Sequence, residues 1–235
     1  MRKVLLVFAI LLVAGVIVAD RVGVRIAQNE IGKQVAAQYN LQTQPEVTIH
    51  GIPFLTQAIQ GDYDQIDVKL GNYTEQGVTV GDVTIEMRGV KAPLSEVVGG
   101  NADNVTARTA TASAVIPYSV IKQRAPKEVQ GISASGDNLK LDLAGALLGT
   151  PLKGSAVVSV KPSAKGIVIT PISGGLEGLP QVPAMGQLVS WRVPVANLPV
   201  GSKITEIQPT PEGLKVGATA SDVRLNDLPN DVPKG

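Results

Sequence analysis

The chain contains few of the side chains that catalysis depends on. It has one histidine, His50, and no cysteine, which excludes Cys-His nucleophiles and the common zinc clusters. A Ser-His-Asp triad would have to use His50, which precedes Gly51 at the end of an expected strand. This inventory predicts a protein that is not an enzyme, with no catalytic residue, no cofactor and no metal site.

Three short motifs resemble reactive or metal-binding sites without matching them. The segment Ser119–Lys122 has the Ser-x-x-Lys spacing of penicillin-recognising enzymes, but their companion Lys-Thr-Gly is absent. The segment Gly131–Gly136 misses the Gly-x-Ser-x-Gly nucleophile elbow by one residue. Asp62 to Asp67 looks like the start of a calcium loop, but its sixth position is Asp67 instead of glycine. We expect a solvated hairpin turn there, and a hydrolase using Ser119 is a distant alternative.

Composition and charge favour a globular, β-rich protein that does not bind nucleic acid. The 235 residues are 44% hydrophobic, include 25 glycines and 16 prolines, and carry a formal net charge of +1. Such frequent glycine and proline favours many short strands over long helices. Removing residues 1–19, which hold two basic and no acidic side chains, would change the net charge to −1. Any lipid affinity must therefore come from apolar burial, because electrostatic attraction to anionic lipid is weak.

The N-terminus has the pattern of an export segment. Arg2 and Lys3 precede the sixteen uncharged residues Val4 to Ala19, and Asp20 ends the run. Sixteen helical residues rise about 24 Å, which falls between a signal-peptide core and a full span of about 30 Å. We predict that residues 1–19 are a signal peptide or a signal anchor. The remainder would then lie outside the cytoplasm, anchored to the plasma membrane or secreted into the cell envelope.

A helical pattern follows from residue 20 to about residue 40. Small and apolar residues recur there at four-residue steps: Gly23, Ala27, Ile31, Val35 and Tyr39. Polar residues fall largely on the other faces, so the helix is predicted to be amphipathic, with Asp20 as its N-cap. Such a helix either packs on the domain or lies along the membrane surface.

From Glu46 onward the apolar period is two, which predicts strands. Expected strands lie at 46–50, 66–70, 78–80, 83–87, 104–115, 132–135, 139–143, 155–161, 167–171, 204–208, 214–220 and 223–225. Short helices are expected at 93–98 and 117–124, and hairpin turns at 136–138 and 211–213. The fold class is therefore α+β and β-rich, with a curved antiparallel sheet or partly open barrel. Residues 20–235 are predicted to form one domain, with a β-rich body at about 45–226.

Two segments are apolar or small on both faces of their expected strands, namely Ala110–Ile116 and Ser155–Val160. A one-sided sheet would place polar residues at every outward position. Small side chains allow a helix or an acyl chain to approach closely, and ten buried methylenes would contribute roughly 8 kcal/mol before ordering costs. The same pattern fits a sandwich with a solid core. The alternatives are thus a lipid-binding protein and a membrane-tethered structural or interaction module without a ligand.

The segment Pro45–Gly61, followed by Ile66–Leu70, resembles the hallmark of the LmeA-like phospholipid-binding proteins, an exported envelope family. The most specific part of the resemblance is Gly51–Gln57. The resemblance implies a fold similar to tubular lipid-binding domains, in which a curved sheet wraps a long helix. It also implies a phospholipid ligand, membrane contact and a role in lipid or lipoglycan assembly or transfer, without defined catalytic residues.

The segment Gly51–Leu55 has two possible roles. Gly51 permits a tight or left-handed backbone and Pro53 removes a hydrogen-bond donor, so the segment is expected to turn. Ile52, Phe54 and Leu55 are the candidate lipid-binding residues. One hypothesis is a bulged turn whose side chains fill the core. The other places Phe54 and Leu55 at a groove mouth or a membrane-facing tip.

Overall fold

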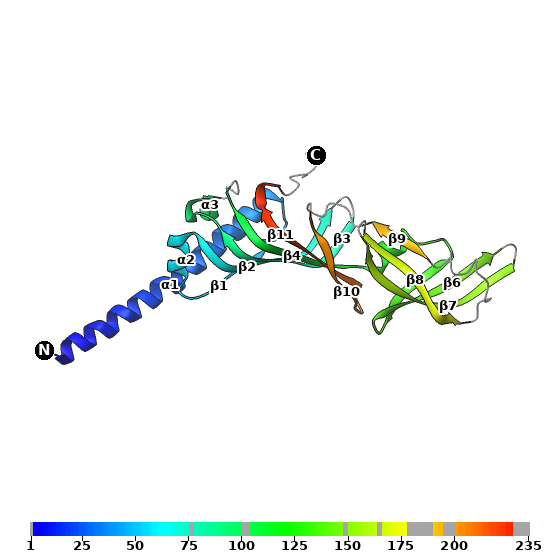
Figure 1. The fold of residues 1–235 in the computed structure, drawn as a ribbon, viewed down its shortest axis with the longest axis horizontal. Coiled ribbons are helices and arrows are strands. Elements are labelled where there is room, and N and C mark those ends of the chain that lie inside the picture. Colours follow the sequence, from blue (N-terminus) through cyan, green and yellow to red (C-terminus); the bar gives the residue numbers. More distant parts are fainter. Residues whose placement is uncertain are drawn as a thin grey trace. The chain divides into compact units, whose positions relative to one another are not determined.

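A computed structural model describes residues 2–75, 78–99, 104–147, 150–163, 166–177, 190–194 and 201–227 (Figure 1). Contacts divide the chain into two compact units. Unit 1 consists of Met1–Gly71, Thr84–Thr111 and Ala220–Gly235, and unit 2 consists of Asn72–Val83 and Ala112–Thr219. The prediction of one domain at 20–235 stays a prediction.

Strands dominate the described residues. The helices are α1 (Arg2–Gln38), α2 (Phe54–Gln60), α3 (Leu94–Gly99) and α4 (Tyr118–Lys122), with a 3₁₀ turn at Leu225–Asp227. The strands are β1 (Glu46–His50), β2 (Asp62–Glu75), β3 (Val78–Lys91), β4 (Thr106–Ile116), β5 (Val129–Ser135), β6 (Asn138–Leu147), β7 (Thr150–Ser163), β8 (Gly166–Glu177), β9 (Trp191–Pro194), β10 (Lys203–Pro209) and β11 (Leu214–Arg224). They form two open antiparallel sheets, ordered β1-β2-β3-β4-β11-β10 and β5-β6-β7-β8-β9. The predicted β-rich fold with a long N-terminal helix is confirmed.

Both predicted hairpin turns are present. Ser135 pairs with Asn138 across the β5–β6 turn, and Pro209 pairs with Leu214 across the β10–β11 turn. The break expected at Gly81-Asp82 is wrong, because β3 continues through it while Asp82 takes a left-handed φ of 48°. The hairpin turn expected at Asp62–Asp67 is also wrong, because these residues form the start of β2, in which Gln65, Ile66 and Asp67 pair with β1.

In unit 1, α1 packs one face against β1 and α2. Its buried residues are spaced as one helical stripe, namely Asp20, Val24, Ala27 and Gly32. They join a core cluster with β1, β2, α2 and parts of β3 and β4: Val47, Ile49, Phe54, Ala58, Tyr63, Ile66, Val68, Val90, Ala92, Val105 and Ala107. The helix start expected at Asp20 is wrong, since α1 is continuous from Arg2 to Gln38 and Asp20 lies inside it.

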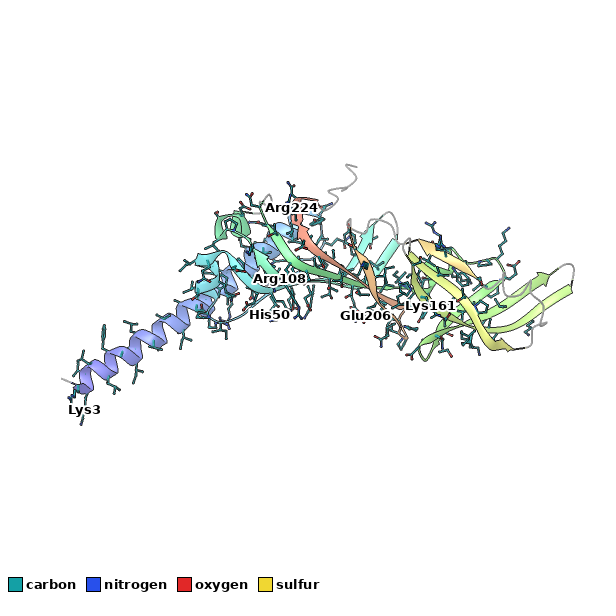
Figure 2. All side chains as sticks on the ribbon, viewed as in Figure 1. Lys3, His50, Arg108, Lys161, Glu206 and Arg224 are labelled. Atoms are coloured by element: carbon teal, nitrogen blue, oxygen red, sulfur yellow. The ribbon has the colours of Figure 1, made fainter. Side chains whose placement is uncertain are left out.

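The N-terminal half of α1 is exposed through Ala19. Figure 2 places Lys3 near the free end of the helix, beyond the body of unit 1. Among the described residues, α1 is the one helix that is long and apolar enough to cross a membrane.

Unit 2 has a core made almost entirely of aliphatic side chains. Leu139 and Leu141 of β6 lie directly opposite Val158 and Ala156 of β7, and all four are fully buried. The rest of the buried cluster comes from α4, β5, β6, β8 and β11: Ile121, Val129, Leu143, Ile167, Ile169, Leu214 and Val216. Burial of this kind is the main stabilising contribution in a chain without disulfides.

Candidate functional site

The family-like segment forms a tight corner between β1 and β2, here called the α2 corner and comprising residues 50–61 together with Asp20. Gly51 begins it with φ of 98°, a conformation that L side chains rarely adopt. A Cβ atom at Gly51 would lie 2.5 Å from Nε2 of Gln57 and 2.9 Å from Oδ2 of Asp64. Glycine is therefore required here for both backbone conformation and space.

Gln57 joins the two strands that flank the corner. Its Nε2 donates to the backbone carbonyl of His50 at 3.1 Å, and its Oε1 accepts from the backbone N–H of Asp64 at 3.0 Å. The side chain is buried within unit 1. Because both amide atoms are satisfied, Gln57 holds the end of β1 and the start of β2 together at little desolvation cost.

Asp20 completes the corner from α1. Pro53, the residue before α2, provides no side-chain cap, so the first N–H groups of α2 need an external acceptor. Oδ1 of Asp20 accepts from the backbone N–H of Leu55 at 2.8 Å, and Oδ2 pairs with the Arg21 guanidinium. Asp20 is thus a helix cap, as its residue type suggested, but for a different helix.

The three candidate lipid-binding residues occupy different environments. Phe54 is 3% exposed and lies in the core of unit 1, with its ring centroid 6.4 Å from that of Tyr63. Leu55 is half-buried and approaches α1 at Gly23. Ile52 is 81% exposed. The turn expected here contains a short helix, and the structure brings Phe54 and Leu55 together against α1 but not Ile52. Lipid contact by any of the three stays a prediction.

Ile59 is a residue that the sequence reasoning missed. It is 86% exposed on α2, whereas Phe54, Gln57 and Ala58 on the same helix are buried. If residues 54–60 had been predicted as a helix, its buried and exposed faces could have been distinguished, because residues 54, 57 and 58 share one side of a helix. The alternating apolar pattern of the strands on either side of α2 obscured this helical spacing.

Several partly buried apolar side chains pack against the core of unit 1. This apolar margin consists of Ile31, Leu70, Ile85 and Met87, which pack against the buried cluster and remain partly exposed. Inside the cluster, the Tyr63 hydroxyl is buried and has no hydrogen-bonding partner among the described residues. Burial raises the pKa of Tyr63, because desolvation disfavours the phenolate.

Unit 2 carries a shallow, open depression of about 530 Å³ on β5, β6 and β7. Its lining includes Asp142, Leu143 and Lys153. The two charged side chains are exposed, while Leu143 belongs to the buried core. The depression therefore has a mostly apolar lining, with two exposed charged side chains among its lining residues.

The side chains considered for catalysis belong to different units, with His50 in unit 1 and Ser119 in unit 2. His50 lies on the surface of unit 1 (Figure 2) and pairs with Asp67 at 2.7 Å. Within the described part of the chain, no cluster of three metal-ligating side chains is present. Ser119 and Lys122 are both exposed on α4 of unit 2.

Comparison with known proteins identifies a family. The profile of the LmeA-like phospholipid-binding family matches residues 18–219, which covers most of the chain and includes Asp20 and the whole α2 corner. No curated protein and no solved structure matches the chain significantly. The resemblance carried by Gly51–Gln57 is confirmed, and the chain belongs to the LmeA-like phospholipid-binding family.

Proposed function

We propose that this protein binds phospholipid on the apolar surface of unit 1, outside the cytoplasm and next to the membrane. The observation that carries the proposal is the family match over residues 18–219. The ligand is a phospholipid or another acyl-chain lipid, and the role is to support lipid or lipoglycan assembly or transfer in the cell envelope.

The apolar margin supports this proposal physically. Leu70, Ile85 and Met87 are apolar and only partly buried, so a ligand can still remove part of their surface from water. Each acyl methylene buried there contributes about 0.8 kcal/mol without any need for a charged partner. This agrees with the net charge of +1, which provides no general attraction for anionic molecules.

The N-terminal half of α1 supports a location at the membrane. Arg2 and Lys3 precede an apolar and fully exposed helical segment, a pattern typical of chains that enter the export pathway. We propose that this segment directs the remainder of the chain to the extracytoplasmic side, either as a retained anchor or as a signal.

Native mass spectrometry and lipid extraction of the purified full chain test the binding proposal. We expect a stoichiometric phospholipid with the wild type, and a several-fold lower lipid content with Met87→Gln in the apolar margin. Val160→Gln is the matched control, because Val160 is a partly buried apolar residue on the unit 2 core. The control is expected to keep its lipid.

A wild-type chain that carries no lipid and takes up none when lipid is added would overturn the proposal. Equal loss from Met87→Gln and Val160→Gln, with unchanged melting temperatures, would place binding outside the apolar margin.

The alternative is a membrane-tethered structural or interaction module with a solid core and no ligand. The observation that favours it is the core of unit 2, where β6, β7 and β8 contribute side chains that are almost fully buried. A lipid-free wild type would support this alternative.

A further inference from the structure

We infer that the outer face of the α2 corner, formed by Ile52 and Ile59, inserts into the phospholipid leaflet that surrounds α1. This rests on the retained-anchor form of the proposed function, in which the N-terminal half of α1 is inserted in the membrane, and adds a second point of membrane contact. The partner is the bilayer itself, at the boundary between its acyl chains and headgroups.

The depth of the α2 corner follows from helix geometry. The sixteen residues from Val4 to Ala19 rise about 24 Å, which leaves about 6 Å of a hydrocarbon core of about 30 Å unspanned. Asp20 is the next residue, and its carboxylate accepts a hydrogen bond from Leu55 at 2.8 Å. The start of α2 therefore lies at the level where the apolar run ends, within the depth that the run leaves unspanned.

The corner exposes two apolar side chains at this level, and they cannot be buried within unit 1. Ile52 is 81% exposed and Ile59 is 86% exposed, although both are bulky aliphatic residues. The opposite side of α2 is occupied by Phe54 and Ala58, which are in the core. Rotating α2 to bury Ile59 would expose Phe54, so a medium other than water has to cover Ile59 if it is to be buried.

The outward-facing side of α1 has the same apolar character at this level. Val22 and Ile26 are exposed on the side of α1 opposite the buried Val24 and Ala27, and Ile26 is 65% exposed. Apolar surface thus continues to Ile26, about seven residues beyond Ala19 or about 10 Å along the helix. The outward-facing part of α1 is then long enough to complete a span.

The charges at this level are compatible with lipid. The Asp20 carboxylate is only 3% exposed and is paired with Arg21, so it presents no free negative charge to a membrane. Arg25 is exposed one turn further along α1. Long basic side chains near the end of a membrane helix can extend to the phosphate layer. The exposed apolar run of α1 ends at Asp20, which is hydrogen-bonded to the corner at Leu55, so lipid around that run is the apolar medium nearest in depth to the corner.

Single-cysteine labelling of the full chain tests the inference cleanly, because the protein has no native cysteine. Ile52→Cys and Ile59→Cys would each carry an environment-sensitive fluorophore in phosphatidylcholine and phosphatidylglycerol vesicles with a nitroxide near the headgroup end of the acyl chains. Val13→Cys, in the middle of the apolar run, is the control for insertion of α1. Gln38→Cys, exposed and about 27 Å along α1 from Asp20, is the control for a position away from the membrane.

We expect lipid quenching at positions 13, 52 and 59 that is several-fold stronger than at position 38. Quenching at position 13 with positions 52 and 59 behaving like position 38 would overturn the inference and leave the membrane insertion of α1 intact. Absence of quenching at position 13 would overturn the proposed insertion and this inference together.

A second variant separates membrane contact from fold. Ile59→Glu should keep the wild-type melting temperature in detergent, since the side chain is exposed, and should lower quenching of the label at position 52 several-fold. Unchanged quenching at position 52 would contradict insertion of the corner. Gln60→Glu, also exposed on α2, is the matched control and should leave quenching unchanged.

Discussion

The two units differ in what they bury. The core of unit 2 consists mainly of aliphatic side chains, most of them from β6, β7 and β8, and its one buried polar atom without a partner among the described residues is Nε1 of Trp191. Unit 1 buries Asp20, Gln57 and the Tyr63 hydroxyl, and its margin is only partly covered. Unit 2 therefore obtains its stability mainly from apolar packing. Unit 1 depends on a few directional contacts, which fix one arrangement of the α2 corner.

The largest expected effect is the loss of an aromatic anchor in unit 1. Phe54→Ala should lower the free energy of unfolding by about 3–5 kcal/mol, because it leaves a cavity between α1 and β2. Leu141→Ala is the counterpart in the unit 2 core and should cost about 2–5 kcal/mol. Chemical denaturation measures both. At temperatures where both variants remain folded, only Phe54→Ala should reduce lipid content. Normal melting of Phe54→Ala would contradict its core role.

Two glycines give the next test. Gly51→Ala should cost at least about 2 kcal/mol, because a positive φ is combined with a clash against Gln57. Gly136→Ala in unit 2 also meets a positive φ, but a Cβ there has no atom within 4 Å. It should cost about 1 kcal/mol. Equal losses in thermal melting experiments would show that the crowding at Gly51 is relieved by movement of Gln57.

A smaller effect is expected from removing the amide that joins β1 to β2. Gln57→Leu leaves the His50 carbonyl and the Asp64 N–H without their partner, and should cost about 1–3 kcal/mol. Ser159→Ala in unit 2 removes a hydroxyl that lies 3.0 Å from Thr170 Oγ1 at a half-buried position, and should cost about 1 kcal/mol. Urea denaturation distinguishes them. A larger loss for Ser159→Ala would reverse the contrast between the units.

Local patterns predicted the strands and turns but not the corner. The alternation of Val47 and Ile49 located β1, and Gly136 located the β5–β6 turn. Asp20 was predicted as a cap because its residue type favours one, but its partner Leu55 lies 35 positions away. No local signal identifies such a partner. α2 was not predicted because it is only seven residues long and follows a proline. Its apolar spacing is too short to distinguish a helix from a turn.

The candidate site was located by its motif, but the roles of its residues were not. In the structure, Phe54 fills space in the core, Gln57 bonds the end of β1, and Gly51 leaves room for Gln57. All three therefore support the fold of the corner. The exposed Ile52 and Ile59 are the residues left without a structural role in unit 1. Only the three-dimensional arrangement separates these two sets, because all of them lie within nine positions of one another.

The chain segments that form each unit also determine an order of folding. Unit 1 is assembled from three separate segments, and its last backbone contact joins Leu225 N–H to the Val105 carbonyl at 3.0 Å, across 120 positions. Most of unit 2 comes from one continuous segment, Ala112–Thr219. Contacts that close long loops form late because of their entropic cost, so unit 2 should acquire hydrogen-exchange protection before unit 1 in a refolding experiment. A nascent chain would thus emerge with unit 1 incomplete, and the proposed lipid-binding surface would mature only after residue 225 had joined it.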